Sequence, residues 1–144
     1  MRRKERKYSI KETSDIFNGR LPADLRTHKL SDGMRLLLAK AASKLRGNIV
    51  DCASLNIMFV SSTDQPAFNV SFKLRPFKVV VFFSECLLSK PEDEQAFIVA
   101  HEIAHFKLKH CLYGGLAEPE DRRQEMEANE TAEKWLGFNP YKKT

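Results

Sequence analysis

The sequence has few cysteines and no long apolar run. Its three cysteines, Cys52, Cys86 and Cys111, are odd in number and widely spaced among 144 residues, without a C-x-x-C pair. This usage argues against a disulfide framework and predicts reduced thiols. No apolar run approaches the length of a membrane span, and the basic start is not followed by the apolar stretch of a signal peptide. We therefore expect a cytoplasmic protein without an integral membrane segment.

Acidic residues are scarce in the first part of the chain. Residues 1–50 hold 13 Lys and Arg against 5 Asp and Glu, whereas residues 51–144 hold 11 against 14. The length suits one domain, and we predict a flexible basic arm at 1–7 and a single domain at 8–144. The basic part could contact nucleic acid or another anionic partner. A solvated basic tail explains it equally well, and we do not favour such a partner.

Hydrophobic periodicity predicts alternating helices and strands, without internal repeats. Gly47 is expected to close the first helix, the S-x-x-E spacing from Ser89 to Glu92 predicts a capping box for the second, and Gly137 is expected to end the last. Residues 8–28 are hard to assign. These elements predict an α+β fold in one domain. The expected helices cover about 31–46, 91–110 and 118–133, and the expected strands cover 55–61, 67–74 and 79–83.

The pattern His101-Glu102-Ile103-Ala104-His105 lies in the second helix and matches H-E-x-x-H. On a helix, residues four apart share a face, so both imidazoles can bind one zinc ion. Glu102 lies at the edge of that face, where its carboxylate can reach a water on the metal without binding the metal. These residues predict a hydrolytic zinc site. A chance match of two unrelated histidines is the alternative.

A catalytic zinc ion usually takes three protein ligands and a water. The metzincin pattern fails, because Leu108 and Cys111 occupy the positions where it needs glycine and histidine. His110 is rotated away from the ligand face, and no histidine follows it. A downstream third ligand should therefore be a carboxylate. The candidates are Glu118, Glu120, Asp121, Glu125, Glu127, Glu130 and Glu133.

Four segments between Ala67 and Pro140 carry a family resemblance. They are Ala67-Phe68 (with Pro66 where asparagine is usual), Val79–Phe83 followed by Cys86–Leu88, Phe97–His105 leading to His110, and Glu125–Asn129 leading to Leu136–Pro140. Together they resemble the catalytic core of gluzincin zinc metallopeptidases. The likeness is to the HtpX/CAAX-prenyl-protease type and to minigluzincins, and more distantly to ImmA/IrrE-type proteins.

The resemblance implies a small zincin-like α+β domain. It would have an N-terminal helix, a three- to four-stranded twisted sheet, the H-E-x-x-H helix packed on that sheet and a C-terminal helix bearing the glutamate ligand. It implies one zinc ion per chain, held by His101, His105 and Glu125. Asn129 takes the place of an aspartate that supports a zinc-binding histidine, so a negative charge beside that histidine is absent here. Glu127 is the alternative ligand if the register differs.

The implied activity is that of a zinc-dependent endopeptidase, with Glu102 as general base and a peptide substrate lying along the 67–74 strand. The group that stabilises the oxyanion is not evident, and the candidates are Tyr113, Arg122, Arg123 and Tyr141. Two alternatives remain open. The chain could be a latent or regulatory zinc-fold protein acting through a partner or nucleic acid, or a dedicated repressor-cleaving protease.

Overall fold

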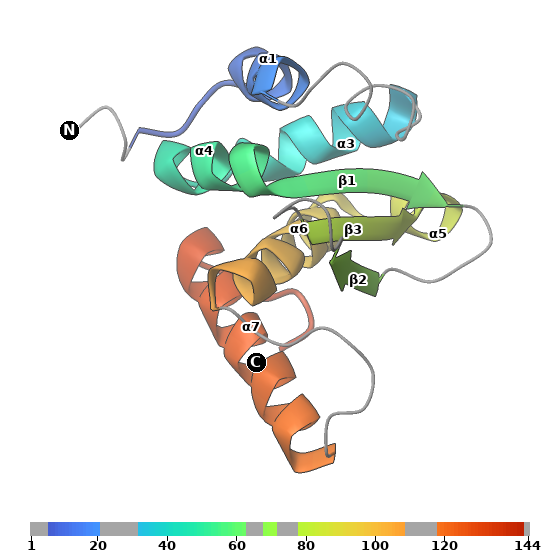
Figure 1. Cartoon of the computed structure of the whole chain (residues 1–144), viewed down its shortest axis with the longest axis vertical. Coiled ribbons are helices and arrows are strands. Elements are labelled where there is room, and N and C mark those ends of the chain that lie inside the picture. The colour runs from blue at the N-terminus through green and yellow to red at the C-terminus, as the bar shows by residue number, and fades with distance from the viewer. Residues whose placement is uncertain (1–5, 21–31, 63–67, 72–77, 109–117, 143–144) are drawn as a thin grey trace.

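The computed structural model describes residues 6–20, 32–62, 68–71, 78–108 and 118–142 (Figure 1). Among these residues it has six helices and three strands. The helices are α1 (Ile10–Arg20), α3 (Asp32–Ala42), α4 (Gly47–Asn56), α5 (Ser84–Leu88), α6 (Glu92–Lys107) and α7 (Glu118–Leu136). The strands are β1 (Ile57–Ser62), β2 (Phe68–Ser71) and β3 (Lys78–Phe83).

The predicted fold class, α+β with a three- to four-stranded twisted sheet, is wrong, because the described chain is mostly helical. The three strands have six, four and six residues. Among the described residues before β1 there are three helices, α1, α3 and α4, where the sequence indicated only one. Among the residues whose burial the structure describes, most buried apolar side chains belong to helices, with Ile57 at the start of β1.

The strands pair in the order β1-β3-β2. β1 runs parallel to β3, with Ile57 opposite Lys78, and β2 runs antiparallel to β3, with Phe68 opposite Val81. The parts of the expected 67–74 strand beyond β2 lie outside the described residues. The short helix α5 separates β3 from α6, which the sequence had placed directly after the strand.

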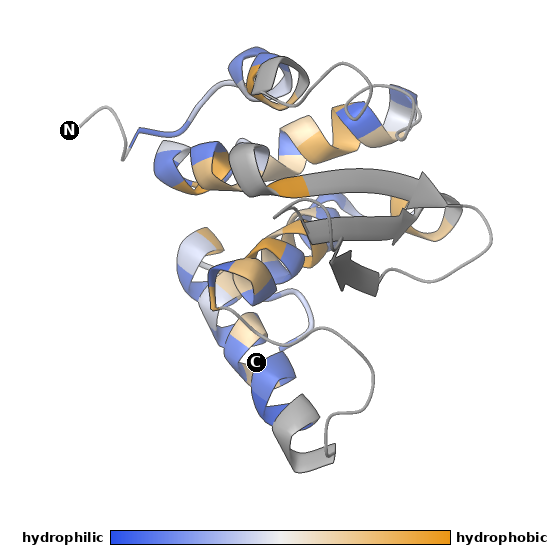
Figure 2. Cartoon of the chain, in the orientation of Figure 1, coloured by the Kyte–Doolittle hydropathy of each residue, from blue (hydrophilic) through white to orange (hydrophobic). Residues whose placement is uncertain are grey.

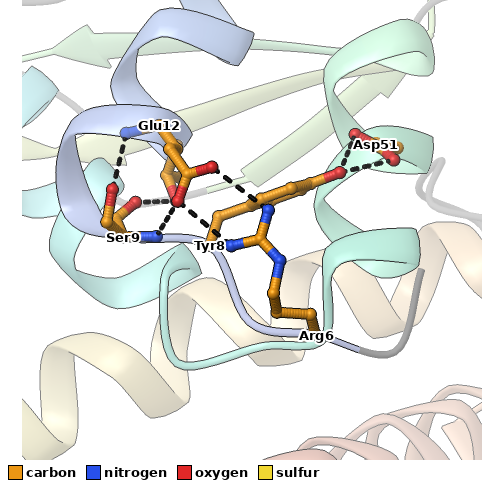
Figure 3. A network of polar contacts seen from close by, with 6 residues as sticks. Arg6, Tyr8, Ser9, Glu12 and Asp51 are labelled. Atoms are coloured by element: carbon orange, nitrogen blue, oxygen red, sulfur yellow. Dashed lines mark hydrogen bonds and ion pairs between the residues drawn. The ribbon is translucent and has the colours of Figure 1, made fainter. Parts of the chain in front are cut away.

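A reciprocal capping box starts α1. The backbone N–H of Ser9 donates to Glu12 Oε1 at 3.0 Å, and the backbone N–H of Glu12 donates to Ser9 Oγ at 3.0 Å (Figure 3). Arg6 donates to both carboxylate oxygens of Glu12, and the Tyr8 hydroxyl donates to Asp51 of α4 at 3.0 and 3.2 Å. We call these five residues the N-terminal network. Because it includes Arg6, the contacts of the folded part begin inside the arm predicted at 1–7.

Gly47 begins α4 instead of closing the preceding helix, which ends at Ala42. The backbone N–H of Gly47 donates to the carbonyl of Arg6 at 2.8 Å, and Lys7 and Arg46 form an isolated β-bridge. A Cβ atom at Gly47 would lie 2.7 Å from the Arg6 carbonyl oxygen. The glycine is therefore required by the close approach of the N-terminal segment, and not by a helix end.

The central helix is α6, which contacts α3 on one side and α7 on the other. Figure 2 shows hydrophobic residues concentrated on α3 and α6 and mainly hydrophilic residues along α7. The predicted capping box at the start of α6 is wrong. Pro91 is the N-cap residue, without a side-chain capping bond, and the Ser89 hydroxyl donates to the carbonyl of Cys86 in α5.

Small side chains bring α6 and α7 close together. Ala100 and Ala104 on α6 and Ala128 and Ala132 on α7 are all buried. Alanine lets two helix backbones approach closely, so the longer side chains beside it can meet across the interface. The helix α7 ends before Gly137, as predicted, and this glycine has a positive φ of 85°. No helix among the described residues has the length and apolar content needed to cross a membrane.

Candidate metal centre

The two motif histidines lie on one face of α6. The Nε2 atoms of His101 and His105 are 3.0 Å apart, and their rings are nearly perpendicular with centroids 4.6 Å apart. His105 is buried, whereas His101 is partly accessible. This is the arrangement expected from a four-residue spacing on a helix, and it leaves both nitrogens facing the same point.

Glu125 reaches the two histidines from α7. Its Oε2 lies 3.1 Å from His101 Nε2, and its Oε1 lies 3.1 Å from His105 Nε2. We call these three residues the His–His–Glu cluster. Half of the Glu125 side chain remains exposed to solvent, at 52%. The cluster is therefore open on the carboxylate side and closed on the His105 side.

The acidic surroundings of the cluster favour positive charge. Burial lowers the pKa of His101, but the hydrogen bond to Glu125 and the charges of Glu102 and Glu125 raise it above its ordinary value. The pKa of Glu125 is held well below its usual range, first by the hydrogen bond from His101 and then by that from His105. The cluster thus keeps an ionised carboxylate against two imidazole nitrogens.

Two further residues act on His101. Asn129 lies one turn beyond Glu125 on α7, and its amide also raises the pKa of His101. His101 Nδ1 is nevertheless buried without a hydrogen-bond partner among the described residues. Glu102 follows His101 directly and is half-buried. A predicted supporting residue and a predicted base therefore lie beside the first histidine.

The alternative glutamate and several predicted contacts lie elsewhere. Glu127 accepts a hydrogen bond from Arg123 at 2.8 Å, and it is not one of the three residues of the metal-binding group. Arg122 is also exposed. Tyr113 lies outside the described residues, as do the side chains of three acidic candidates at positions 118, 120 and 121.

Tyr141 packs beside the first half of α6. Its ring meets Phe97 edge-on with centroids 5.8 Å apart, and burial together with Glu94 raises the pKa of its phenol. Glu94 precedes His101 by seven residues, or about 10 Å along the helix axis. In this arrangement the Tyr141 hydroxyl is placed near Glu94 rather than at the cluster.

Two exposed apolar residues lie close to the cluster residues in the sequence, and sequence reasoning missed both. Met126, next to Glu125, is 60% exposed, and Leu108 at the end of α6 is 39% exposed. The sequence did indicate that Met126 would be exposed. It lies between two glutamates on a polar helix, and no apolar residue lies one turn before or after it.

The donor set fits a divalent metal ion. Two imidazole nitrogens and a carboxylate lie within 4.8 Å of one another, and they form the candidate metal-binding group found among the described residues. Tetrahedral zinc with bonds of about 2.0–2.1 Å requires donor atoms about 3.3–3.4 Å apart. The observed separations of 3.0 and 3.1 Å are close to this value. A small outward movement of each side chain would admit the ion.

Comparison with known families agrees with this donor set. Residues 53–119 match the model of Peptidase family M48, a family in which zinc dependence is typical. The matched segment contains all three strands and the whole of α6, and it supports a metallopeptidase activity in general. It ends before Glu125, so the match does not include the third residue of the cluster. No curated protein and no solved structure matches the chain significantly.

Proposed function

We propose that this chain is a zinc-dependent metalloendopeptidase of the gluzincin type. The observation that carries the proposal is the meeting of His101, His105 and Glu125 from two helices, with Glu102 directly beside the first histidine. The family match supports the wider class of metallopeptidases. The HtpX/CAAX-prenyl-protease or minigluzincin type, the more distant ImmA/IrrE type and a cytoplasmic location remain expectations from the sequence.

Five residues of the chain have distinct roles in the proposed reaction. His101, His105 and Glu125 would hold the ion. Bound zinc supplies Lewis acidity, which polarises a peptide carbonyl and acidifies water. Glu102 accepts the proton of the attacking water at its carboxylate and then delivers it to the leaving amine. Asn129 supports the orientation of His101 from α7.

Glu102→Gln tests the proposed base directly. The variant keeps the shape of the side chain but cannot accept a proton, so hydrolysis should fall by about 10²–10⁴-fold while the zinc content stays at one ion per chain. Casein and a quenched fluorescent peptide library report hydrolysis, and elemental analysis reports zinc. Glu127→Gln is the matched control, because it removes a nearby glutamate that pairs with Arg123 outside the cluster.

Two outcomes would change the proposal. A Glu102→Gln variant with full zinc content and full activity would remove Glu102 as the base. A wild-type protein that holds zinc but cleaves neither substrate would favour a latent or single-substrate protein. Two contacts favour a protein that binds zinc without general activity. Arg123 pairs with Glu127, and Tyr141 lies beside Glu94. Neither candidate is thus placed to stabilise the oxyanion.

A further inference from the structure

A second site lies on the opposite side of α6 from the metal cluster. A cavity of about 290 Å³ is lined by residues of α1, α3 and α6 and of the segment after α3. The metal cluster instead lies between α6 and α7. The lining residues are Ile10, Lys40, Ala41, Ser43, Lys44, Glu92 and Gln95. The volume is near the lower end of the range for ligand pockets, and it suits one apolar side chain with its flanking backbone.

Four cations without an ion pair among the described residues lie in the wall of this cavity or on the chain segments next to it. Lys44 lies in its wall, Lys11 follows the lining residue Ile10, and Lys7 forms the β-bridge with Arg46 just beyond. None of these four cations forms an ion pair in the part of the chain that the structure describes. The acidic side chains nearby are already engaged, since Glu12 pairs with Arg6 and Glu92 with Lys40. We call Lys7, Lys11, Lys44 and Arg46 the basic corner.

The cavity also presents acceptors to a peptide backbone. The Gln95 amide nitrogen donates to the carbonyls of Leu87 and Leu88 at 3.1 and 3.4 Å, which fixes the orientation of this side chain. Its amide oxygen has no partner among the described residues. The Glu92 carboxylate, 3.7 Å from Lys40, is a second acceptor. Peptide N–H groups can satisfy both oxygens.

We propose that the cavity and the basic corner together bind an acidic segment of a partner protein, with one apolar side chain of that segment inserted into the cavity. Ile10, Ala41 and the methylene stems of the lysines contact the inserted side chain. Carboxylates on either side of it meet the cations of the basic corner. The chemistry favours a peptide over nucleic acid, because a phosphate backbone brings no N–H donors to Glu92 and Gln95. No aromatic ring lines the described cavity for bases to stack upon.

The test measures binding by fluorescence anisotropy on the full-length protein at low ionic strength. The probe is a labelled peptide in which a single leucine is flanked on both sides by aspartate and glutamate. Competing probes are the same peptide with serine for leucine and a labelled single-stranded oligonucleotide. We expect the leucine peptide to bind most tightly and its affinity to fall as salt is added.

Charge reversal locates the site. Lys44→Glu and the more exposed Lys11→Glu should each weaken binding of the leucine peptide about three- to tenfold, since each removes an attraction and adds a repulsion. Lys134→Glu on α7 carries the same charge change away from the cavity and should alter binding less than about twofold. Ile10→Ser should abolish the preference for leucine over serine. Thermal melting shows that each variant is folded.

Three results would overturn the proposal. They are an acidic peptide that does not bind at low ionic strength, an equal effect of Lys134→Glu and Lys44→Glu, and tighter binding of the oligonucleotide than of the leucine peptide. The last would assign the basic corner to nucleic acid. The proteins tested all carry Glu102→Gln, so hydrolysis of the probe does not enter the measurement and the test is independent of the proposed peptidase activity.

Discussion

The N-terminal network and the His–His–Glu cluster are both polar groups joined across elements, but they differ in how their hydrogen bonds are completed. In the N-terminal network, donors meet acceptors, with Arg6 on Glu12 and Tyr8 on Asp51. In the cluster, three groups that bind metals through lone pairs converge within about 3 Å, and His101 Nδ1 has no described partner. The first arrangement is complete in itself, whereas the proposed function requires a cation in the second.

The largest difference should appear when zinc is added. At a free zinc concentration about 1,000 times the dissociation constant, the free energy of unfolding of the wild type should rise by about 4 kcal/mol. The rise should vanish in His105→Ala, which removes the buried histidine, and persist in Glu12→Gln, which alters only the N-terminal network. Chemical unfolding with and without zinc measures both. If zinc raises the free energy of unfolding of His105→Ala as much as that of the wild type, zinc binds somewhere other than the cluster.

Affinity for zinc should distinguish two glutamates of α7 that are two residues apart. Glu125→Ala removes one of three metal donors and should weaken zinc binding by at least about 100-fold, or about 2.7 kcal/mol. Glu127→Ala loses an ion pair with Arg123 outside the cluster and should bind zinc as the wild type does. Competition with a chromogenic chelator gives both constants. The reverse order would move the third ligand to Glu127.

Tyr8→Phe should affect stability without affecting zinc. The Tyr8 hydroxyl donates to both carboxylate oxygens of half-buried Asp51, and its removal should lower the free energy of unfolding by about 1–2 kcal/mol. Zinc affinity should not change, because the N-terminal network lies at the start of α1 and α4, and the cluster lies between α6 and α7. Urea unfolding and a zinc titration of one preparation make the comparison. A variant that loses zinc affinity would show that the two groups are coupled.

The smallest expected effect is on how the free energy of unfolding depends on pH below neutrality. The pKa of Glu12 is lowered to about 2, first by the hydrogen bond from Arg6 and then by the backbone N–H of Ser9. A carboxylate with a lowered pKa stabilises the fold above its unfolded pKa of about 4.5, and this contribution is lost as the pH falls toward 2. Glu12→Gln should therefore be less stable than the wild type at neutral pH, and the difference should shrink over this window.

The control for acid unfolding is Glu130→Gln, an exposed glutamate of α7 with no ion pair among the described residues. Urea unfolding at several pH values should show that the free energies of unfolding of Glu130→Gln and the wild type do not converge as the pH falls. If Glu12→Gln and the wild type differ equally at all pH values, the ion pair with Arg6 does not act through the charge of Glu12.

Local patterns in the sequence predicted α6 well and the helices before it poorly. The observed α6, Glu92–Lys107, lies within the expected 91–110, because its apolar residues and acidic first turn are local signals. Gly47 was misread because the contact that requires a glycine there comes from Arg6, about 40 residues earlier in the chain. No local pattern reports a contact of that kind.

Two S-x-x-E spacings show the same limit. Ser89 and Glu92 were expected to form a capping box, but Ser89 bonds to α5 and Pro91 takes the N-cap position. Ser9 and Glu12 have the same spacing and do form the reciprocal pair, in a region that the sequence left unassigned. The spacing is thus necessary for the motif, while the preceding element decides whether the serine is available.

Within the site, the histidine pair followed from a four-residue spacing on one helix, whereas the glutamate required the fold. Glu125 was singled out by resemblance from seven acidic candidates, and its approach to both imidazoles depends on the packing of α7 against α6. The cavity behind α6 had no signal in the sequence, since its lining comes from segments up to 85 residues apart.

X-ray absorption at the zinc edge of the zinc-loaded protein tests the central claim most directly. The account predicts one zinc ion per chain with two imidazole ligands and oxygen donors at about 2.0–2.2 Å, and loss of an oxygen donor in Glu125→Ala. Sulfur scattering at about 2.3 Å, or a spectrum unchanged in both His101→Ala and His105→Ala, would contradict it.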